Sequence, residues 1–127
     1  RAQKTYVARL TGRLQADRGT VDLPLGSDWD YRPRQKVDLD HGRPAVTDWQ
    51  VIDRNDDETR VRLSPHTGRS HQLRLHMLAL GHQILGDQIY APETLPDNAR
   101  LMLHAETLAL HHPVTGNWMS FTAPVPF

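Results

Sequence analysis

The segment Pro65–Met77 constrains the fold more than any other stretch of this sequence. It places three histidines and two arginines around a glycine turn. Ser70 is a suitable N-cap, leucine and methionine residues follow it, and Gly81 can adopt the left-handed conformation that ends a helix. The segment therefore predicts a helix of about three turns with Ser70 as its N-cap.

Arg74 should lie among buried neighbours in this helix, because apolar side chains occur around most of its circumference. A guanidinium does not release its proton, so in apolar surroundings it needs an anionic partner. The segment contains no carboxylate. The partner is either an ordinary surface acid or an anion bound at the site. His71, one turn earlier, would face the same partner, and the helix N-terminus with Arg69 suits a phosphate.

Short runs of alternating apolar and polar residues predict strands through most of the remaining chain. Pro24 limits one of them to a short edge strand. Leu101–Leu110 fits a helix or a strand by periodicity alone. The expected strands are Thr5–Leu10, Val21–Leu25, Ala45–Ile52 paired as a hairpin with Thr59–Leu63, and Trp118–Thr122. The fold class is therefore α+β, a mostly antiparallel mixed sheet with one short helix in a single domain.

The charge distribution bears on nucleic-acid binding. The net charge is zero, which argues against it, yet all but one of the 15 lysines and arginines precede residue 75. In the segment 28–36, two aromatic residues alternate with Arg32, Arg34 and Lys36. Such a mixture suits an RNA backbone, where rings stack and cations meet phosphates, or else it is a solvated loop whose aromatic residues turn inward.

Several other classes of protein are disfavoured. The chain has no cysteine, no apolar run of membrane-spanning length and no signal-peptide pattern, so we expect a soluble protein and no disulfide. Eight histidines invite a metal site. However, His71 and His76 would lie about 140° apart around a helix, and no metal-binding motif is present, so we expect no metal.

Several motifs occur along nearly the whole sequence. The string Thr-Gly-Arg-Ser-His-Gln-Leu-Arg-Leu-His-Met, residues 67–77, resembles the most recognisable C-terminal motif of the RluA-type pseudouridine synthases. The similarity extends to Lys4–Arg9 around an active-site tyrosine, to Leu80–Tyr90, and to the closing segments Leu101–Ala105 and Phe121–Pro124. The resemblance favours a strand for residues 101–110.

The resemblance implies an isomerase that converts uridines to pseudouridine in large-subunit rRNA or a tRNA anticodon stem-loop. It implies a cytoplasmic monomer that needs no cofactor. Tyr6 would stack on the flipped base and serve a late proton transfer, and Arg74 would form a salt bridge to the catalytic aspartate. Leu63 would form part of the apolar wall of the site, and Arg69 and His71 would face RNA. Roles for Arg32, Arg34 and Lys36 as phosphate contacts are inferred from residue type and position.

One element of the family pattern is missing from this sequence. Enzymes of the family carry the catalytic aspartate in a His-Arg-Leu-Asp segment upstream of the tyrosine motif, and no such segment occurs here. We therefore expect residues 1–127 to be the C-terminal portion of a single catalytic domain, inactive alone unless Asp87 or Glu106 supplies the acid. The alternative is a non-catalytic RNA-binding module. His66 also departs from the family, which has an aliphatic residue there.

Overall fold

The computed structural model describes residues 3–28, 34–90, 100–111 and 118–127. Eight strands and one helix occur in these ranges. They are β1 (Gln3–Thr11), β2 (Arg18–Asp22), β3 (Leu25–Ser27), β4 (Gln35–Val37), β5 (Val46–Arg54), β6 (Glu58–Pro65), α1 (Gln72–Ala79), β7 (Leu103–His111) and β8 (Trp118–Thr122). The one helix in these ranges is not long and apolar enough to cross a membrane.

Six of the strands form one sheet in the order β2-β5-β6-β1-β7-β8, and β3 pairs with β4 in a separate ribbon. All of these pairs are antiparallel. The predicted α+β class is confirmed, as are the central hairpin and the strand assignment near residue 103. Pro24 interrupts the expected Val21–Leu25 strand, which divides into the edge strand β2 and the short β3. A proline has no N–H to continue the ladder.

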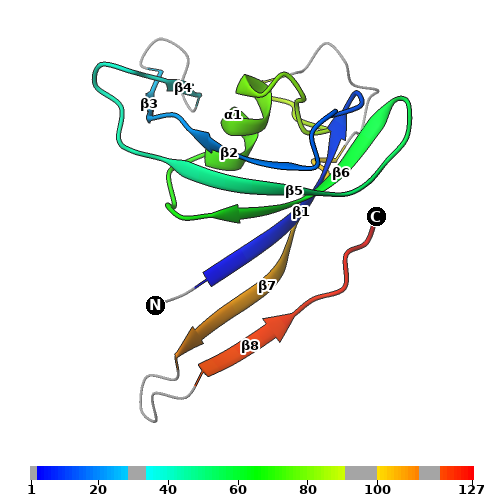
Figure 1. The fold of residues 1–127 in the computed structure, drawn as a ribbon. Coiled ribbons are helices and arrows are strands. Elements are labelled where there is room, and N and C mark those ends of the chain that lie inside the picture. The colour runs from blue at the N-terminus through cyan, green and yellow to red at the C-terminus, as the bar shows by residue number, and fades with distance from the viewer. Residues whose placement is uncertain (1–2, 29–33, 91–99, 112–117) are drawn as a thin grey trace.

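The hydrophobic core lies between the sheet and the helix (Figure 1). Alternation along β1 and β6 directs Ala8, Leu10, Val61 and Leu63 into it, all with 0% exposure. Met77 of α1 is equally buried among them. In Figure 1, β7 and β8 run away from the helix, so the core is concentrated at the helix end of the sheet.

The helix is shorter than predicted and begins one residue later. It spans Gln72–Ala79, and its N-cap is His71 rather than Ser70. His71 has φ 54° and makes no side-chain cap hydrogen bond. The predicted end at Gly81 is correct, since this glycine has φ +94° and its N–H bonds back to Leu78. Ser70 was wrong as the cap because the turn before the helix is held by other side chains, described below.

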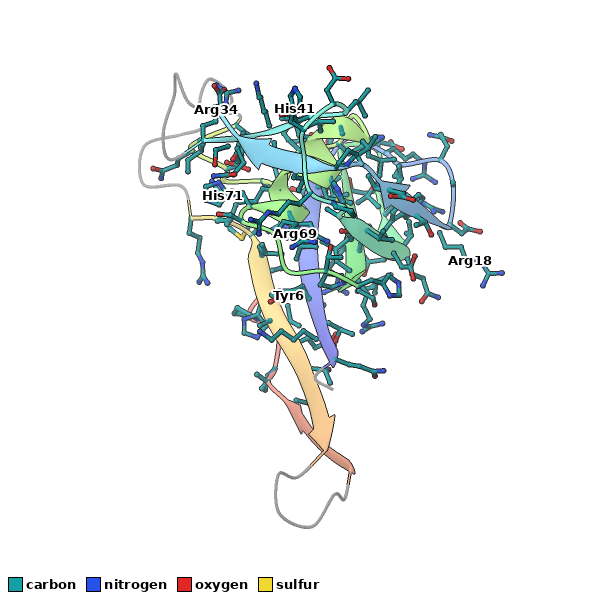
Figure 2. The ribbon with its side chains drawn as sticks, turned by 90° about the vertical axis from the view of Figure 1, so that its left-hand side faces the viewer. Tyr6, Arg18, Arg34, His41, Arg69 and His71 are labelled. Atoms are coloured by element: carbon teal, nitrogen blue, oxygen red, sulfur yellow. The ribbon has the colours of Figure 1, made fainter. Side chains whose placement is uncertain are left out.

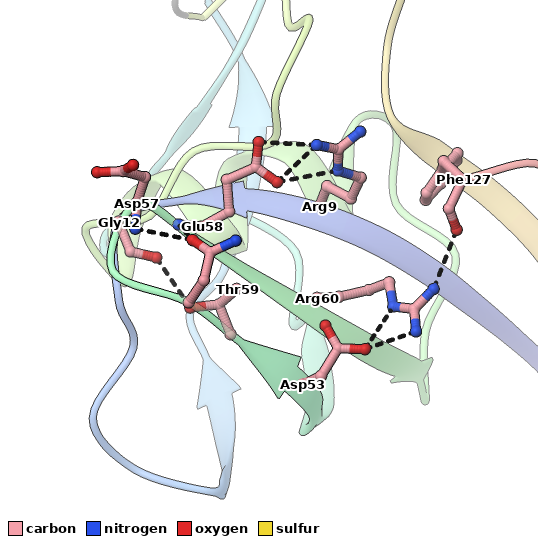
Figure 3. Close-up of polar contacts among 9 residues, drawn as sticks. Arg9, Gly12, Asp53, Asp57, Glu58, Thr59, Arg60 and Phe127 are labelled. Atoms are coloured by element: carbon pink, nitrogen blue, oxygen red, sulfur yellow. Dashed lines mark hydrogen bonds and ion pairs between the residues drawn. The ribbon is translucent and has the colours of Figure 1, made fainter.

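Polar contacts fasten the central strands to one another and to the C-terminus (Figure 3). The Arg9 guanidinium on β1 donates to both carboxylate oxygens of Glu58 on β6 at 2.6–3.1 Å. Arg60 on β6 pairs with Asp53 on β5 and donates to the carbonyl oxygen of Phe127 at 3.1 Å. These contacts hold β1, beside which the candidate site lies, in register with its neighbours.

Candidate functional site

A cavity of about 610 Å³ opens between β1, the turn after β6 and the start of α1. It is lined by Lys4, Tyr6, residues 65–69, His71–Arg74, Leu101 and Leu103. Figure 2 looks onto this side of the molecule, with Tyr6, Arg69 and His71 on the same face. Four of the predicted site residues thus meet at one place, although up to 68 positions separate them (74 − 6).

Tyr6 reaches the cavity from the middle of β1. Its strand neighbours are Leu63 on β6 and Ala105 on β7, and the β1–β7 register shifts between Thr5 and Tyr6. Such irregularities re-aim side chains and are common beside active sites. The half-buried ring of Tyr6 packs against the hydrophobic core. The core therefore supports one side of the ring, and the rest faces the cavity.

The turn that carries Arg69 is fixed by the buried side chain of Gln72. Its Oε1 accepts hydrogen bonds from the Thr67 hydroxyl at 2.6 Å and the Arg69 amide at 3.1 Å. Its Nε2 donates to the carbonyl oxygen of Val46 and the Thr47 hydroxyl, both at 3.0 Å. Sequence reasoning missed this role, because glutamine forms no recognisable cap at the first position of a helix. Gln72 ties the cavity rim to β5.

His76 is a structural residue rather than a site residue. It is completely buried, its Nδ1 accepts from the Thr47 hydroxyl at 2.8 Å, and its Nε2 donates to the carbonyl oxygen of Leu23 at 2.9 Å. The direction follows because a carbonyl only accepts. Burial lowers the pKa of His76, which favours this neutral form. One histidine of the motif thus joins the helix to the strands beneath it.

Arg74 has a partner that the sequence did not reveal. Its Nε and Nη2 donate to the two carboxylate oxygens of Asp87 at 3.1 and 2.6 Å, and Asp87 is completely buried. Asp87 also accepts from the amides of Ile89 and Tyr90. Burial raises the pKa of Asp87, but the contacts with Arg74 and these amides outweigh it, so the pKa lies below its usual value. The partner of Arg74 among the described residues is therefore a buried acid of this chain, rather than a surface acid.

Asp87 engages only one edge of the guanidinium. Nε and one hydrogen of Nη2 are used, and Nη1 with the second Nη2 hydrogen forms the other donor edge. Arg74 lines the cavity, with 16% of its side chain exposed. Arg74 can therefore bind a second anion there while Asp87 holds it in place.

The described lining of the cavity is cationic. It contains Lys4, Arg69 and Arg74 and no carboxylate. Asp48 does not line the cavity, but it binds Nε2 of the lining residue His66 at 2.6 Å and accepts from the Thr20 hydroxyl. These hydrogen bonds lower the pKa of Asp48. Among the described residues no three potential ligands gather as a metal site would require. The cavity is thus suited to an anionic ligand.

The other predicted site residues lie apart from this cavity. Leu63 has 0% exposure and lies in the core behind Tyr6, so it does not contact the cavity directly. Arg32 lies outside the described residues. Arg34 immediately precedes β4 and Lys36 lies within it, and neither residue lines the cavity. Lys36 lines a second hollow of about 640 Å³ that shares Arg69 with the first.

The fold matches those of solved RNA pseudouridylate synthase domains. Residues 1–79 match the RNA pseudouridylate synthase family, and the chain belongs to that family. Two solved structures are similar across the whole fold. "Human RNA Pseudouridylate Synthase Domain Containing 1" has a TM-score of 0.85 and 33% sequence identity, covering 100% of this chain and 56% of that one. "Human RNA Pseudouridylate Synthase Domain Containing 4" has a TM-score of 0.76 and 25% identity, covering 98% and 58%.

Individual bacterial relatives share more of the sequence. "Dual-specificity RNA pseudouridine synthase RluA" of Pasteurella multocida (strain Pm70) is 54% identical over 127 residues, covering 98% of this chain and 58% of that protein. The proteins of the same name from Yersinia pestis and Escherichia coli (strain K12) are also 54% identical, with 62% and 58% of their lengths covered. The chain thus spans about three fifths of the relatives it matches.

Proposed function

We propose that this chain is the C-terminal portion of a catalytic domain that isomerises specific uridines to pseudouridine in structured RNA. The substrates would be large-subunit rRNA, a tRNA anticodon stem-loop, or both. The observation that carries the proposal is the cavity that joins Tyr6 to Arg74 in a member of the pseudouridylate synthase family. The complete protein would act as a cytoplasmic monomer without a cofactor.

The reaction explains why these residue types belong together. Pseudouridine forms when the bond between ribose C1′ and uracil N1 breaks, the base turns, and C5 joins the sugar. The target base must leave its stack, and the site must then hold the detached uracil. A carboxylate near C1′ starts the cleavage, and a cation beside it keeps it ionised and oriented.

Tyr6 and Arg74 fit two of these roles. The supported ring of Tyr6 provides a face for the flipped uracil, and its hydroxyl can take part in proton transfer at C5. The second donor edge of Arg74 would bind the catalytic aspartate, and Asp87 would anchor the first. Asp87 is completely buried, and Glu106 pairs with Arg62 at 2.9 Å. Neither lines the cavity, so the nucleophile would come from outside this chain.

RNA would follow the cationic rim from the cavity into the second hollow. That hollow is lined by Lys36, Arg43 and Arg69, and it also contains His41 and Asp38. Asp38 accepts hydrogen bonds from the amides of its own loop, at residues 40 and 41. The three cations are thus placed to contact phosphates next to the flipped nucleotide. Arg34, nearby on the same loop, would extend this contact surface.

A second candidate function is RNA binding without catalysis. It is favoured by the absence of a carboxylate from the described cavity lining. Such a module would bind RNA through the same cations but would never break a glycosidic bond.

Tritium release from RNA labelled at uridine C5 separates these functions, because pseudouridine formation replaces the hydrogen at C5. We expect release by the full-length protein that contains this chain and none by residues 1–127 alone. No release by the full-length protein, despite RNA binding, would favour the binding module. Release by residues 1–127 alone would mean that a carboxylate of this chain starts the reaction.

A further inference from the structure

Tyr90 contacts both the helix start and β4. It follows the turn that carries Asp87 and is 6% exposed. Its hydroxyl accepts a hydrogen bond from the Gln35 amide at 2.9 Å and lies 2.7 Å from Nδ1 of His71. The two rings meet edge to face, with centroids 5.5 Å apart. Tyr90 therefore positions the imidazole of His71, which lines the cavity.

The ring of Tyr90 also contacts two guanidiniums. The Cζ atoms of Arg34 and Arg74 lie 5.5 and 5.4 Å from its centroid, within the range of cation–π attraction. These contacts depend on the aromatic ring and not on the hydroxyl. Replacing Tyr90 by phenylalanine would keep them and remove only the hydrogen bonds, which makes the hydroxyl separately testable.

The direction of the hydrogen bond to His71 follows from donor and acceptor capacity. A phenol hydroxyl has one hydrogen to donate, and the Gln35 amide already occupies one of its lone pairs. Nδ1 of His71 is the one acceptor recorded for that hydrogen among the described residues. If Nδ1 were protonated, the buried hydroxyl would lose this acceptor, at a cost in stability. The hydroxyl therefore donates to Nδ1, and the histidine proton resides on Nε2.

The charged surroundings agree with this arrangement. Burial and the nearby Arg74 lower the pKa of His71, while Asp87 opposes them more weakly. Burial raises the pKa of Tyr90, so its hydroxyl keeps its proton. No hydrogen bond to Nε2 of His71 occurs within the described part of the chain. Among the described residues, Tyr90 is the recorded hydrogen-bond and ring-contact partner of this imidazole.

We infer that Tyr90 is a positioning residue that holds His71 as a neutral imidazole with its proton on Nε2. The cavity then offers a directional hydrogen-bond donor beside its three cations, without adding a fourth charge. The identity of the acceptor rests on the proposed function: the N–H at Nε2 of His71 would donate to an oxygen of the substrate RNA, on the uracil or on a neighbouring phosphate.

Long-range ¹H–¹⁵N NMR of the imidazoles in the full-length protein tests the inference without any substrate. The signal of His71 is assigned by its loss in His71→Asn, since asparagine tolerates the left-handed conformation. We expect a protonated Nε2 and an unprotonated Nδ1 between pH 7 and 8, and a mixture of tautomers with a raised His71 pKa in Tyr90→Phe. A proton on Nδ1 in the unmodified protein would overturn the inference. So would an unchanged tautomer in Tyr90→Phe.

Kinetics then ask whether Tyr90 acts through His71. We expect Tyr90→Phe to raise KM for RNA about fivefold, the usual effect of one hydrogen bond, with a smaller effect on kcat. In the His71→Asn background the same change should have no further effect. An equal effect in both backgrounds would show that Tyr90 acts through Gln35 and β4, against the inference. If no variant or parent forms pseudouridine, the proposed function fails while the NMR result stands.

Discussion

Replacing Asp87 by asparagine should destabilise the protein strongly. The carboxylate is completely buried and accepts hydrogen bonds from Arg74 Nε and Nη2 and from the amides of Ile89 and Tyr90. Asparagine has no charge and only one carbonyl oxygen, and its NH2 group would face a donor. Removing one partner of a buried ion pair costs about 3–5 kcal/mol. We expect a loss of this size in the free energy of unfolding, measured by urea denaturation of the full-length protein at pH 7.

Asp53→Asn is the matched control for this experiment. Asp53 also pairs with an arginine, Arg60, but 59% of its side chain is exposed. Exposed pairs contribute about 0–1 kcal/mol. If Asp87→Asn and Asp53→Asn lowered the unfolding free energy by the same small amount, the reasoning that Asp87 anchors Arg74 inside the protein would be refuted.

The stability difference between the unmodified protein and Asp87→Asn should also depend on pH. The pKa of Asp87 is lower in the folded protein than its usual value, because the contacts with Arg74 and the backbone amides outweigh the effect of burial. In the unfolded protein the carboxyl titrates at about pH 4, so the ionised pair contributes fully to the stability above that pH. Its contribution is lost as the pH falls through the lower folded pKa. The difference in stability between the unmodified protein and Asp87→Asn should therefore be constant from pH 5 to 7 and shrink below pH 4.

Variants at Tyr6, Arg74 and Gly86 test other parts of the structure. Tyr6→Phe keeps the stacking ring, so KM for RNA should change little while kcat falls on the order of 100-fold; a large rise in KM would show that the hydroxyl takes part in binding. Arg74→Lys loses the forked contact to Asp87, so tritium release should fall at least about 100-fold, and near-normal turnover would contradict its role. Gly86→Ala should cost at least about 2 kcal/mol by urea denaturation, because Gly86 has φ +81° and its Cβ would lie 1.8 Å from a backbone oxygen. Gly68→Ala, where nothing lies within 4 Å, should be nearly neutral.

The strands were largely predictable because their signal is local. Alternation of apolar and polar residues sets the two faces of a strand, and the turn residues near Asn55 place the hairpin of β5 and β6. The helix was predicted in the right place, yet its first residue was not. Serine is a suitable residue type for an N-cap, but the position of the turn depends on Gln72. The hydrogen-bond partners of Gln72, Val46 and Thr47, come from a strand distant in sequence.

The sequence by itself determined the family, the strand pattern and the presence of Tyr6 and Arg74 as chemically suitable residues. Only the tertiary structure decided their partners. Asp87 lies 13 positions from Arg74, and Tyr90 lies 19 positions from His71. Neither separation matches the short spacing at which side chains become neighbours on one helix or strand. A turn folded back on the helix brings these groups together. The pairing of side chains depends on where that turn packs, because hydrogen bonds and ion pairs form at about 3 Å, a precision that local sequence patterns do not carry.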